Sequence, residues 1–203
     1  MARTISEINT GTHLNPFKIY SDNVLYPNLG ESYGERSSDG IEWLGYNSSW
    51  LMHMTKSAQS TEVLTGEIVY VWCDINRGYT TTPAYEQIFD ISGSYIRADS
   101  SDGKPVTGCY IKNEYEDNFE VVRRYPWMLS ANTGYSTGCN RVRVICNLDK
   151  DVIGNLTQFN PDKLGGGISD VVSGSMYVYC VCDGNTSQEY ELSVRSQLIY
   201  KDI

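Results

Sequence analysis

Short runs of alternating residue types, each closed by a turn signal, are the feature that most constrains how this chain folds. The strongest run is "EVLTGEIVYVWCDIN", residues 62–76, in which Tyr70, Trp72 and Asp74 alternate with valines and a cysteine. A period of two in β-branched and aromatic residues is typical of a half-buried strand. We expect this strand to end at Asn76, because the Asn-Arg-Gly that begins there predicts a turn.

Similar segments continue to the end of the chain, with turn signals such as Asp102-Gly and Asp183-Gly-Asn between them. No convincing helical pattern of ten or more residues is present, although residues 84–91 fit a short helical turn. Residues 150–174 read as a long connection within one domain. About eight strands at this spacing are typical of a sandwich or jelly roll. The sequence therefore predicts an all-β fold, an eight-stranded antiparallel jelly-roll sandwich.

The beginning of the chain differs from the rest. Residues 1–40 are polar, contain Gly and Asn, and show little periodicity, so we interpret them as an extended N-terminal arm. The remainder, residues 41–203, then forms a single jelly-roll domain. A chain of 203 residues with 40% hydrophobic residues is long enough to bury a core of this kind.

Charge and targeting signals narrow the class of protein. A formal net charge of −9 argues against a chain that coats itself with nucleic acid through a global positive field, so any polyanion contact must be local. No apolar run reaches membrane-spanning length, and the N-terminus has no apolar core of a secretory signal. We therefore expect synthesis in the cytosol, no membrane partner, and six reduced cysteines.

Residues suited to catalysis or metal binding are scarce. The chain has only two histidines, His13 and His53, and lacks a P-loop, a GxGxxG after a strand and an HExxH. The closest cysteine spacing, Cys180-Val-Cys182, is not a zinc-binding pair. These features predict a protein that is not an enzyme, with no cofactor and no metal.

An acidic cluster lies in "NEYEDNF", where Glu114 and Glu116 are expected to share one strand face and Asp117 follows. Carboxylates grouped in this way are weak candidates for calcium binding or for a glycosidase site. A solvated acidic edge that blocks stray strand pairing explains them without any ligand.

Two pairs of arginines are candidates for contact with nucleic acid. Arg141 and Arg143 alternate in "NRVRVIC" and leave the same face of one strand, and Arg123 and Arg124 precede "YPWML". Guanidinium groups hold phosphates as bidentate forks. In an acidic protein, the same arginines also serve as salt bridges between subunits.

In chain order, "LGESYGERSSDGI", "IVYVWCDINRGYTTTPAYEQIFD", "NFEVVRRYPWML", "SGSMYVYCVCD" and "VRSQLIYKDI" form a series of motifs. Together they resemble the single jelly-roll coat proteins of small icosahedral viruses, those of satellite necrosis-type plant viruses and of circular single-stranded DNA viruses in particular. The resemblance covers residues 29–203. Asn118 stands where many members have an Arg, and Arg124-Tyr125 replaces an acidic residue.

This resemblance implies a structural protein, a coat subunit that is made in the host cytoplasm, assembles with copies of itself into an icosahedral shell, and resides in the virion. Other coat proteins, the packaged genome and a host receptor or glycan are further expected partners. One departure matters: such proteins usually begin with an Arg/Lys-rich arm, whereas residues 1–30 hold Arg3 and Lys18 against Glu7 and Asp22. We therefore expect only weak, local contacts with the genome.

The loop that follows the strongest strand is the predicted subunit interface, because long jelly-roll loops gather where neighbouring subunits meet. The alternative is an idle surface loop. The interface candidates are Arg77, Tyr79, Thr80, Thr81 and Pro83.

A second hypothesis is a β-sandwich carbohydrate- or receptor-binding module, as in phage tails and fibres. Exposed Trp43, Trp50 and Trp127 would then stack on sugar rings, so the exposure of these tryptophans discriminates between the two hypotheses. A third hypothesis is an enzyme of cupin or glycosidase type on the same fold, and the shortage of histidines speaks against a cupin.

Overall fold

The computed structural model describes the chain except residues 15–18, 57–62, 77, 92–106, 131–140 and 184–188. Strands dominate it, and each helix is a single short turn. The strands are β1 (Arg3–Leu14), β2 (Tyr20–Asn23), β3 (Gly40–Lys56), β4 (Val63–Ile75), β5 (Phe119–Ser130), β6 (Arg141–Asn147), β7 (Leu156–Phe159), β8 (Val171–Asp183) and β9 (Glu189–Asp202). The helical turns are α1 (Tyr85–Ile88), η1 (Asn113–Tyr115), α2 (Asp149–Val152) and η2 (Ile168–Asp170).

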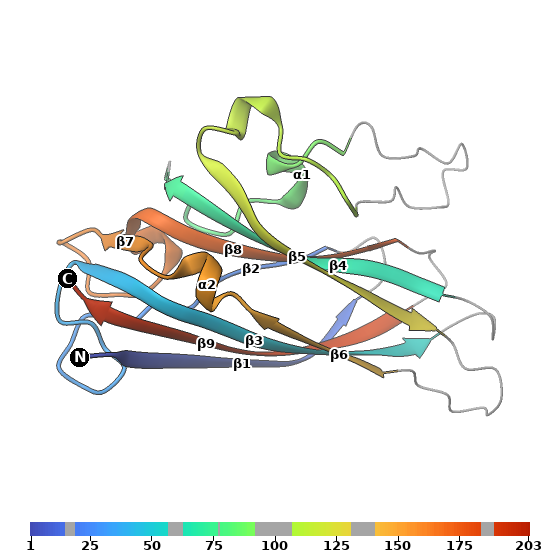
Figure 1. Ribbon diagram of the computed structural model, residues 1–203, viewed down its shortest axis with the longest axis horizontal. Coiled ribbons are helices and arrows are strands. Elements are labelled where there is room, and N and C mark those ends of the chain that lie inside the picture. Colours follow the sequence, from blue (N-terminus) through green and yellow to red (C-terminus); the bar gives the residue numbers. More distant parts are fainter. Residues whose placement is uncertain (15–18, 57–62, 77, 92–106, 131–140, 184–188) are drawn as a thin grey trace.

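The strands pair from the two ends of the chain inward. β1 pairs with β9, β2 with β8, β3 with β6 and β4 with β5, all antiparallel. β9 also pairs with β3 and β8 with β4, which gives one layer in the order β1-β9-β3-β6 and a second in the order β2-β8-β4-β5 (Figure 1). An antiparallel ribbon wound into two sheets in this order is a jelly roll. The predicted all-β antiparallel jelly roll is thus confirmed.

β7 is a ninth strand that the sequence analysis does not predict. It pairs with the start of β3, through Gly40–Glu42, and with the start of β8, through Val171 and Ser173. It therefore joins the two layers by backbone hydrogen bonds at the end of the molecule where both termini lie (Figure 1). The connection expected over 150–174 holds this strand together with α2 and η2.

The first 40 residues contribute more to the sheets than an extended arm would. β1 is the outermost strand of its layer, in register with β9 from Arg3 opposite Tyr200 to Leu14 opposite Tyr190. β2 adds a short strand to β8. Two paired strands thus lie within residues 1–40, and the expected division into an arm over 1–40 and a domain over 41–203 stays a prediction.

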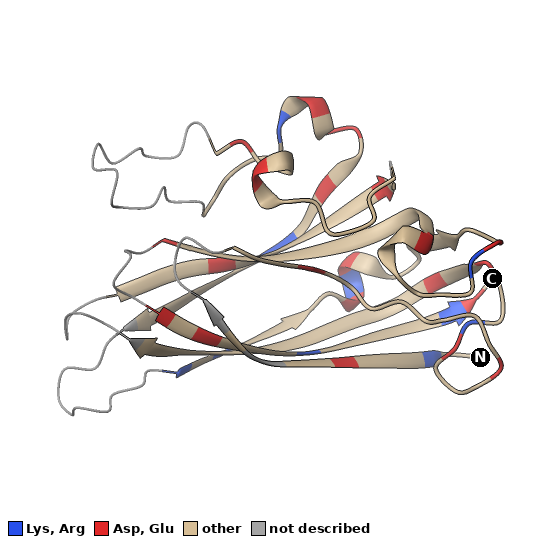
Figure 2. Cartoon of the chain, turned by 180° about the vertical axis from the view of Figure 1, so that it is seen from behind, with Lys and Arg blue, Asp and Glu red and all other residues tan. Residues whose placement is uncertain are grey.

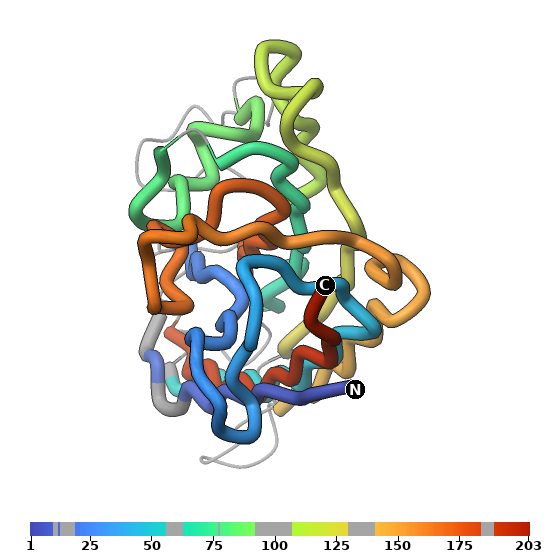
Figure 3. Tube along the Cα trace, turned by 90° about the vertical axis from the view of Figure 1, so that its left-hand side faces the viewer, coloured from blue at the N-terminus to red at the C-terminus, as the bar shows by residue number. Residues whose placement is uncertain are grey.

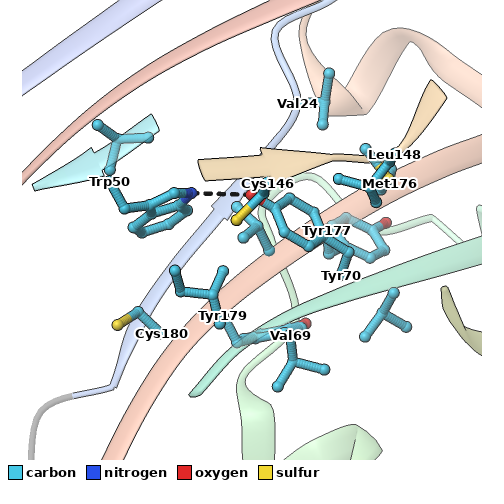
Figure 4. Close-up of a cluster of buried hydrophobic side chains, with 14 of the residues drawn as sticks. Val24, Trp50, Val69, Tyr70, Cys146, Leu148, Met176, Tyr177, Tyr179 and Cys180 are labelled. Carbon is cyan, nitrogen blue, oxygen red and sulfur yellow. Dashed lines mark hydrogen bonds between the residues drawn. The ribbon is translucent and has the colours of Figure 1, made fainter. Parts of the chain in front are cut away.

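The core lies between the two layers and is rich in aromatic rings. Trp43 meets Trp72 edge to face with ring centroids 5.4 Å apart, and Tyr46 meets Tyr70 at 5.9 Å. The indole of Trp50 donates a hydrogen bond of 2.9 Å to the Tyr70 hydroxyl (Figure 4). Buried indole and phenol groups need such partners, so these bonds fix the register of the two layers.

The two layers differ in what covers their outer faces. Residues 68–73 of β4 are all buried, the most exposed being Trp72 at 8%. The reason is the β4–β5 connection, which lies over this layer (Figures 1 and 3) and packs Tyr85 and Phe89 against Tyr179 of β8, with centroids 5.5 and 6.1 Å apart. The strand expected to be half-buried is therefore buried on both sides, with Trp72 facing the core and Cys73 the cover.

We call the β2-β8-β4-β5 layer the covered sheet and the β1-β9-β3-β6 layer the open sheet. Along β9, buried residues such as Leu192 and Leu198 alternate with exposed ones such as Arg195 and Gln197. This alternation is that of a sheet packed on one side only. No helix in the described part of the chain has the length and apolar character needed to cross a membrane.

Candidate functional site

The outer face of the open sheet brings together residues from three neighbouring strands. Arg141 and Arg143 of β6 are both exposed on this face, as expected from their alternation. In the strand register Ile145 lies opposite Ser49 of β3, which in turn lies opposite Arg195 of β9. Arg195, which the sequence analysis does not single out, therefore shares the face with the two predicted arginines.

The charges on this face are unevenly compensated. His53 lies 3.6 Å from a carboxylate oxygen of Glu191, and Lys201 pairs with Glu42 at 2.8 Å. In contrast, no ion pair or side-chain hydrogen bond joins an arginine of this face to another described residue. Three guanidinium groups are thus left facing solvent: those of Arg141, Arg143 and Arg195.

The second predicted pair of arginines is placed differently. Arg124 donates hydrogen bonds to the carboxylate of Glu67 and to the carbonyl oxygen of Cys109, and its guanidinium lies 5.6 Å from the ring centre of Phe89. Arg123 pairs with Asp151 of α2 at 3.3 Å. Arg124 therefore holds the cover on the covered sheet, and both side chains are engaged within the subunit. They do not join the arginines of the open face.

The predicted interface loop is firmly anchored at its start. Asn76 accepts a hydrogen bond of 2.8 Å from the backbone N–H of Tyr79 through its side-chain oxygen. Its side-chain amide donates to the carbonyl oxygens of Ile168 and Val171, at 2.8 and 2.9 Å. Asn76 thus ties the loop to η2 and to the start of β8, at the β7 end of the molecule.

Beyond this anchor the loop residues divide into buried and exposed ones. Pro83 is buried, and its carbonyl oxygen accepts a hydrogen bond of 2.9 Å from the Tyr179 hydroxyl. Tyr79 is half-buried against Phe119, whereas Thr80 and Thr81 are exposed. Arg77 lies outside the described residues. Of the predicted interface set, only the two threonines are described with exposed side chains, and their contact with another subunit stays a prediction.

The acidic cluster does not lie on a strand. Glu114 is part of the helical turn η1, and Glu116 and Asp117 follow it, so the expectation that the two glutamates share a strand face is wrong. The cause is a backbone turn, in which Tyr115 and Asn118 donate hydrogen bonds to the carbonyl groups three residues earlier. All three carboxylates are exposed. Across the described residues, no group of three His, Cys, Asp or Glu side chains is arranged to hold a metal ion.

All four tryptophans of the chain are buried. Trp43 and Trp50 are fully buried, and Trp127 is 5% exposed. None of them can stack on a sugar without unpacking the core. The residues on which the carbohydrate-binding hypothesis rests are therefore core residues.

The described cysteines are buried thiols. Burial raises the pKa of Cys146 to about 11, and burial also raises the pKa of Cys182 to about 12. Thiols protonated at neutral pH are poor nucleophiles and poor metal ligands. Cys180 and Cys182 face the core between the layers and have a packing role.

A small polar cluster lies where the edges of the two sheets meet. Glu7 of β1 and Asp22 of β2 are bridged by the side-chain amide of Asn9, which donates to one oxygen of each at 3.2 Å. The Tyr20 hydroxyl donates to Asp22 at 2.8 Å. Partial burial and the charge of Asp22 raise the pKa of Glu7, so this junction between the sheets is sensitive to pH.

Comparisons with known proteins do not change the fold assignment, which rests on the strand order. No protein-family model and no curated protein matches the chain. Among solved structures, that of desmodium yellow mottle tymovirus is 11% identical with a TM-score of 0.31, covering 100% of this chain and 81% of its own. The BFDV capsid protein in a 60-mer is 8% identical with a TM-score of 0.30 (100% and 94%), and peanut lectin is 11% identical with a TM-score of 0.32 (99% and 100%).

Proposed function

We propose that this chain is a coat subunit that assembles with copies of itself into a closed icosahedral shell around a viral genome. The observation that carries the proposal is the combination of a complete jelly-roll strand order with the burial of every tryptophan. The strand order suits both a coat subunit and a sugar-binding sandwich, because one fold hosts many functions. Burial of the tryptophans disfavours the sugar-binding alternative.

A surface suited to subunit contact lies beside the predicted interface loop. Ile75, the last residue of β4, is 59% exposed, and Val172 of β8 is 48% exposed. Ile75 pairs with Ser173, and the backbone N–H of Asn76 donates to the carbonyl oxygen of Val172, so both apolar residues lie at the end of β4 and β8 from which the loop with Thr80 and Thr81 starts. Apolar residues rimmed by polar ones are typical of protein contact sites. We assign this end of β4 and β8 to contact between subunits.

The proposal places the protein in the virion, with further coat proteins and a receptor or glycan as additional partners. It involves no catalysis. Each threonine and apolar side chain contributes modestly, and a shell gains its stability from many such contacts repeated by symmetry.

The test is the mass of the purified protein in solution, measured by light scattering and paired with negative-stain imaging. We expect uniform closed particles. A monomer or small oligomer at every concentration, in the presence and absence of nucleic acid, would contradict self-assembly by this chain alone.

Variants locate the contact. We expect Ile75→Asp combined with Val172→Asp to lower particle yield at least tenfold, on the order of the loss of one hot-spot contact. Val63→Asp combined with Met128→Asp, exposed apolar residues at the opposite end of the covered sheet, is the charge-matched control and leaves particle yield unchanged. Equal yields from both variants would remove this end of β4 and β8 from the contact surface.

A further inference from the structure

The two outer surfaces of the sandwich differ in charge. Over the covered sheet, the described part of the β4–β5 connection carries one cation, Lys112, among several exposed carboxylates (Figure 2). These carboxylates are Glu86, Asp90, Glu114, Glu116 and Asp117. On the opposite side, the open face presents the three arginines without a described acidic partner. A chain of net charge −9 has thus placed unpaired positive charge on one face.

The spacing of these arginines suits a chain of phosphates. Arg141 and Arg143 are two residues apart on one strand, which separates their Cα atoms by about 7 Å. Arg195 lies two strands away and one side-chain row along, at a Cα distance of about 12 Å from Arg143. Flexible side chains at these distances on one sheet face can each meet a different phosphate of one extended strand.

The residues around the arginines favour a nucleic acid over a protein partner. Ser49 and Gln197 lie on the same face, and hydroxyl and amide groups of this kind contact phosphate and sugar oxygens. A stable protein interface instead has an apolar centre depleted of charge. Here the most exposed apolar side chains, Ile8 and Ile145, stand apart from one another on β1 and β6.

We propose that the open face binds the phosphate backbone of the enclosed nucleic acid through Arg141, Arg143 and Arg195. The proposal rests on the coat function above and extends it, because it orients the subunit. The open sheet faces the interior of the shell, and the acidic connection with α1 and η1 faces outward. It also supplies a local positive surface in a chain whose first 30 residues contain only Arg3 and Lys18 as basic residues.

The experiment measures binding of the full chain to fluorescein-labelled 20-nucleotide oligo(dT) and oligo(U) by fluorescence anisotropy over a salt series. The test variant replaces the three arginines by serine. The control variant replaces the exposed or half-exposed Lys112, Lys150 and Lys163 by serine, so that the net charge changes equally.

We expect the arginine variant to bind at least about tenfold more weakly at low salt, with a log–log salt slope reduced by about 2, the value for three lost contacts to a single strand. The lysine control keeps the wild-type slope. Equal losses in both variants would mean that net charge, and not this face, governs binding, and would overturn the proposal. Absence of wild-type binding to both oligonucleotides would overturn it as well.

Particle formation, measured on the same samples, keeps the two proposals separate. Intact particles of the arginine variant with less nucleic acid per particle support both. Particles with unchanged nucleic acid content contradict the phosphate-binding face and leave the coat function standing. Loss of particles without a change in oligonucleotide affinity would instead make the face a subunit interface, whose arginines meet acidic residues of another copy.

Discussion

The covered and open sheets have the same number of principal strands and share one core, yet their outer faces have opposite characters. β4 and β8 of the covered sheet are buried on both sides and contain near-continuous apolar runs, "IVYVWC" and "MYVYCVC". β9 of the open sheet alternates buried and exposed residues along most of its length. One connection, between β4 and β5, creates this difference by packing its aromatic residues on one sheet only.

The comparison shows that a strand's sequence indicates whether one or both of its faces are buried, in addition to indicating that a strand is present. A run buried on both faces contributes to two packing layers, one between the sheets and one under the cover. The open face has no such second layer, so its side chains are free to be chosen for contacts outside the subunit. Substitutions should therefore have unequal effects on the two sides.

The largest expected effect is on packing under the cover. Phe89 is fully buried and stacks on Tyr85 with ring centroids 4.2 Å apart, so Phe89→Ala should lower the free energy of unfolding by about 4 kcal/mol. Ile145→Ala on the open face, where the side chain is 71% exposed, should change it by less than about 0.5 kcal/mol. Urea unfolding of the unassembled protein measures both. Similar losses in the two variants would mean that the cover does not form a packed layer.

A somewhat smaller effect is expected at the ion pair that fastens the cover. Arg124→Met leaves the carboxylate of Glu67, whose side chain is 10% exposed, with the backbone N–H of Gly108 but without its charged partner, and should cost about 3 kcal/mol. The double variant Glu67→Gln, Arg124→Met removes both charges and should recover at least half of that loss. Arg143→Met on the open face is the control and should be nearly neutral. A double variant as unstable as the single one would show that the charge pairing is not the cause.

The smallest effect is expected where the edges of the two sheets meet. The pKa of Glu7 is raised in the folded state, first by partial burial and then by the charge of Asp22. The protonated form therefore stabilises the fold at low pH, and this stabilisation is lost as the pH rises through the folded-state pKa. Glu7→Gln should thus increase stability at pH 7 by less than about 1 kcal/mol, the range for partly exposed charges. The gain should vanish below about pH 3, where the carboxyl is protonated in both states.

Thermal unfolding of wild type and Glu7→Gln at both pH values makes this comparison. Asn9 can still donate to the amide oxygen of the new side chain, so hydrogen bonding is preserved. A loss of stability at pH 7 would show that the ionised carboxylate is a net favourable partner of Asn9.

The fold class could be predicted because alternation and turn signals depend on neighbouring residues. The short helical turn at α1 and the extended strand at β4 were within reach for that reason. The pairing of the strands could not be predicted in this way, since β1 pairs with β9 from the other end of the chain. The four residues of β7 are too short for a periodicity, and the polar sequence of β1 gives no strong signal for a strand.

The candidate site shows the same limit. The alternation of Arg141 and Arg143 predicts a shared face, but only the register reveals that Arg195 lies on it. For Arg124 the sequence predicts the wrong neighbours. Its position opposite Val69 depends on an irregularity in the β4–β5 pairing at Tyr70. Sequence neighbours alone therefore place Arg124 with Arg123, although one side chain reaches the cover and the other reaches α2.

The strand β7 has a mechanical consequence. Its hydrogen bonds to β3 and β8 cross from one sheet to the other, whereas most of the contact between the sheets elsewhere consists of side-chain packing. Hydrogen-bonded backbone resists separation more than packed side chains do, so the sandwich should open like a hinge, with its axis at β7 and its largest displacement at the far end. A subunit built in this way can change the angle between its two sheets while the end of β4 and β8 that carries Ile75 and Val172 keeps its shape.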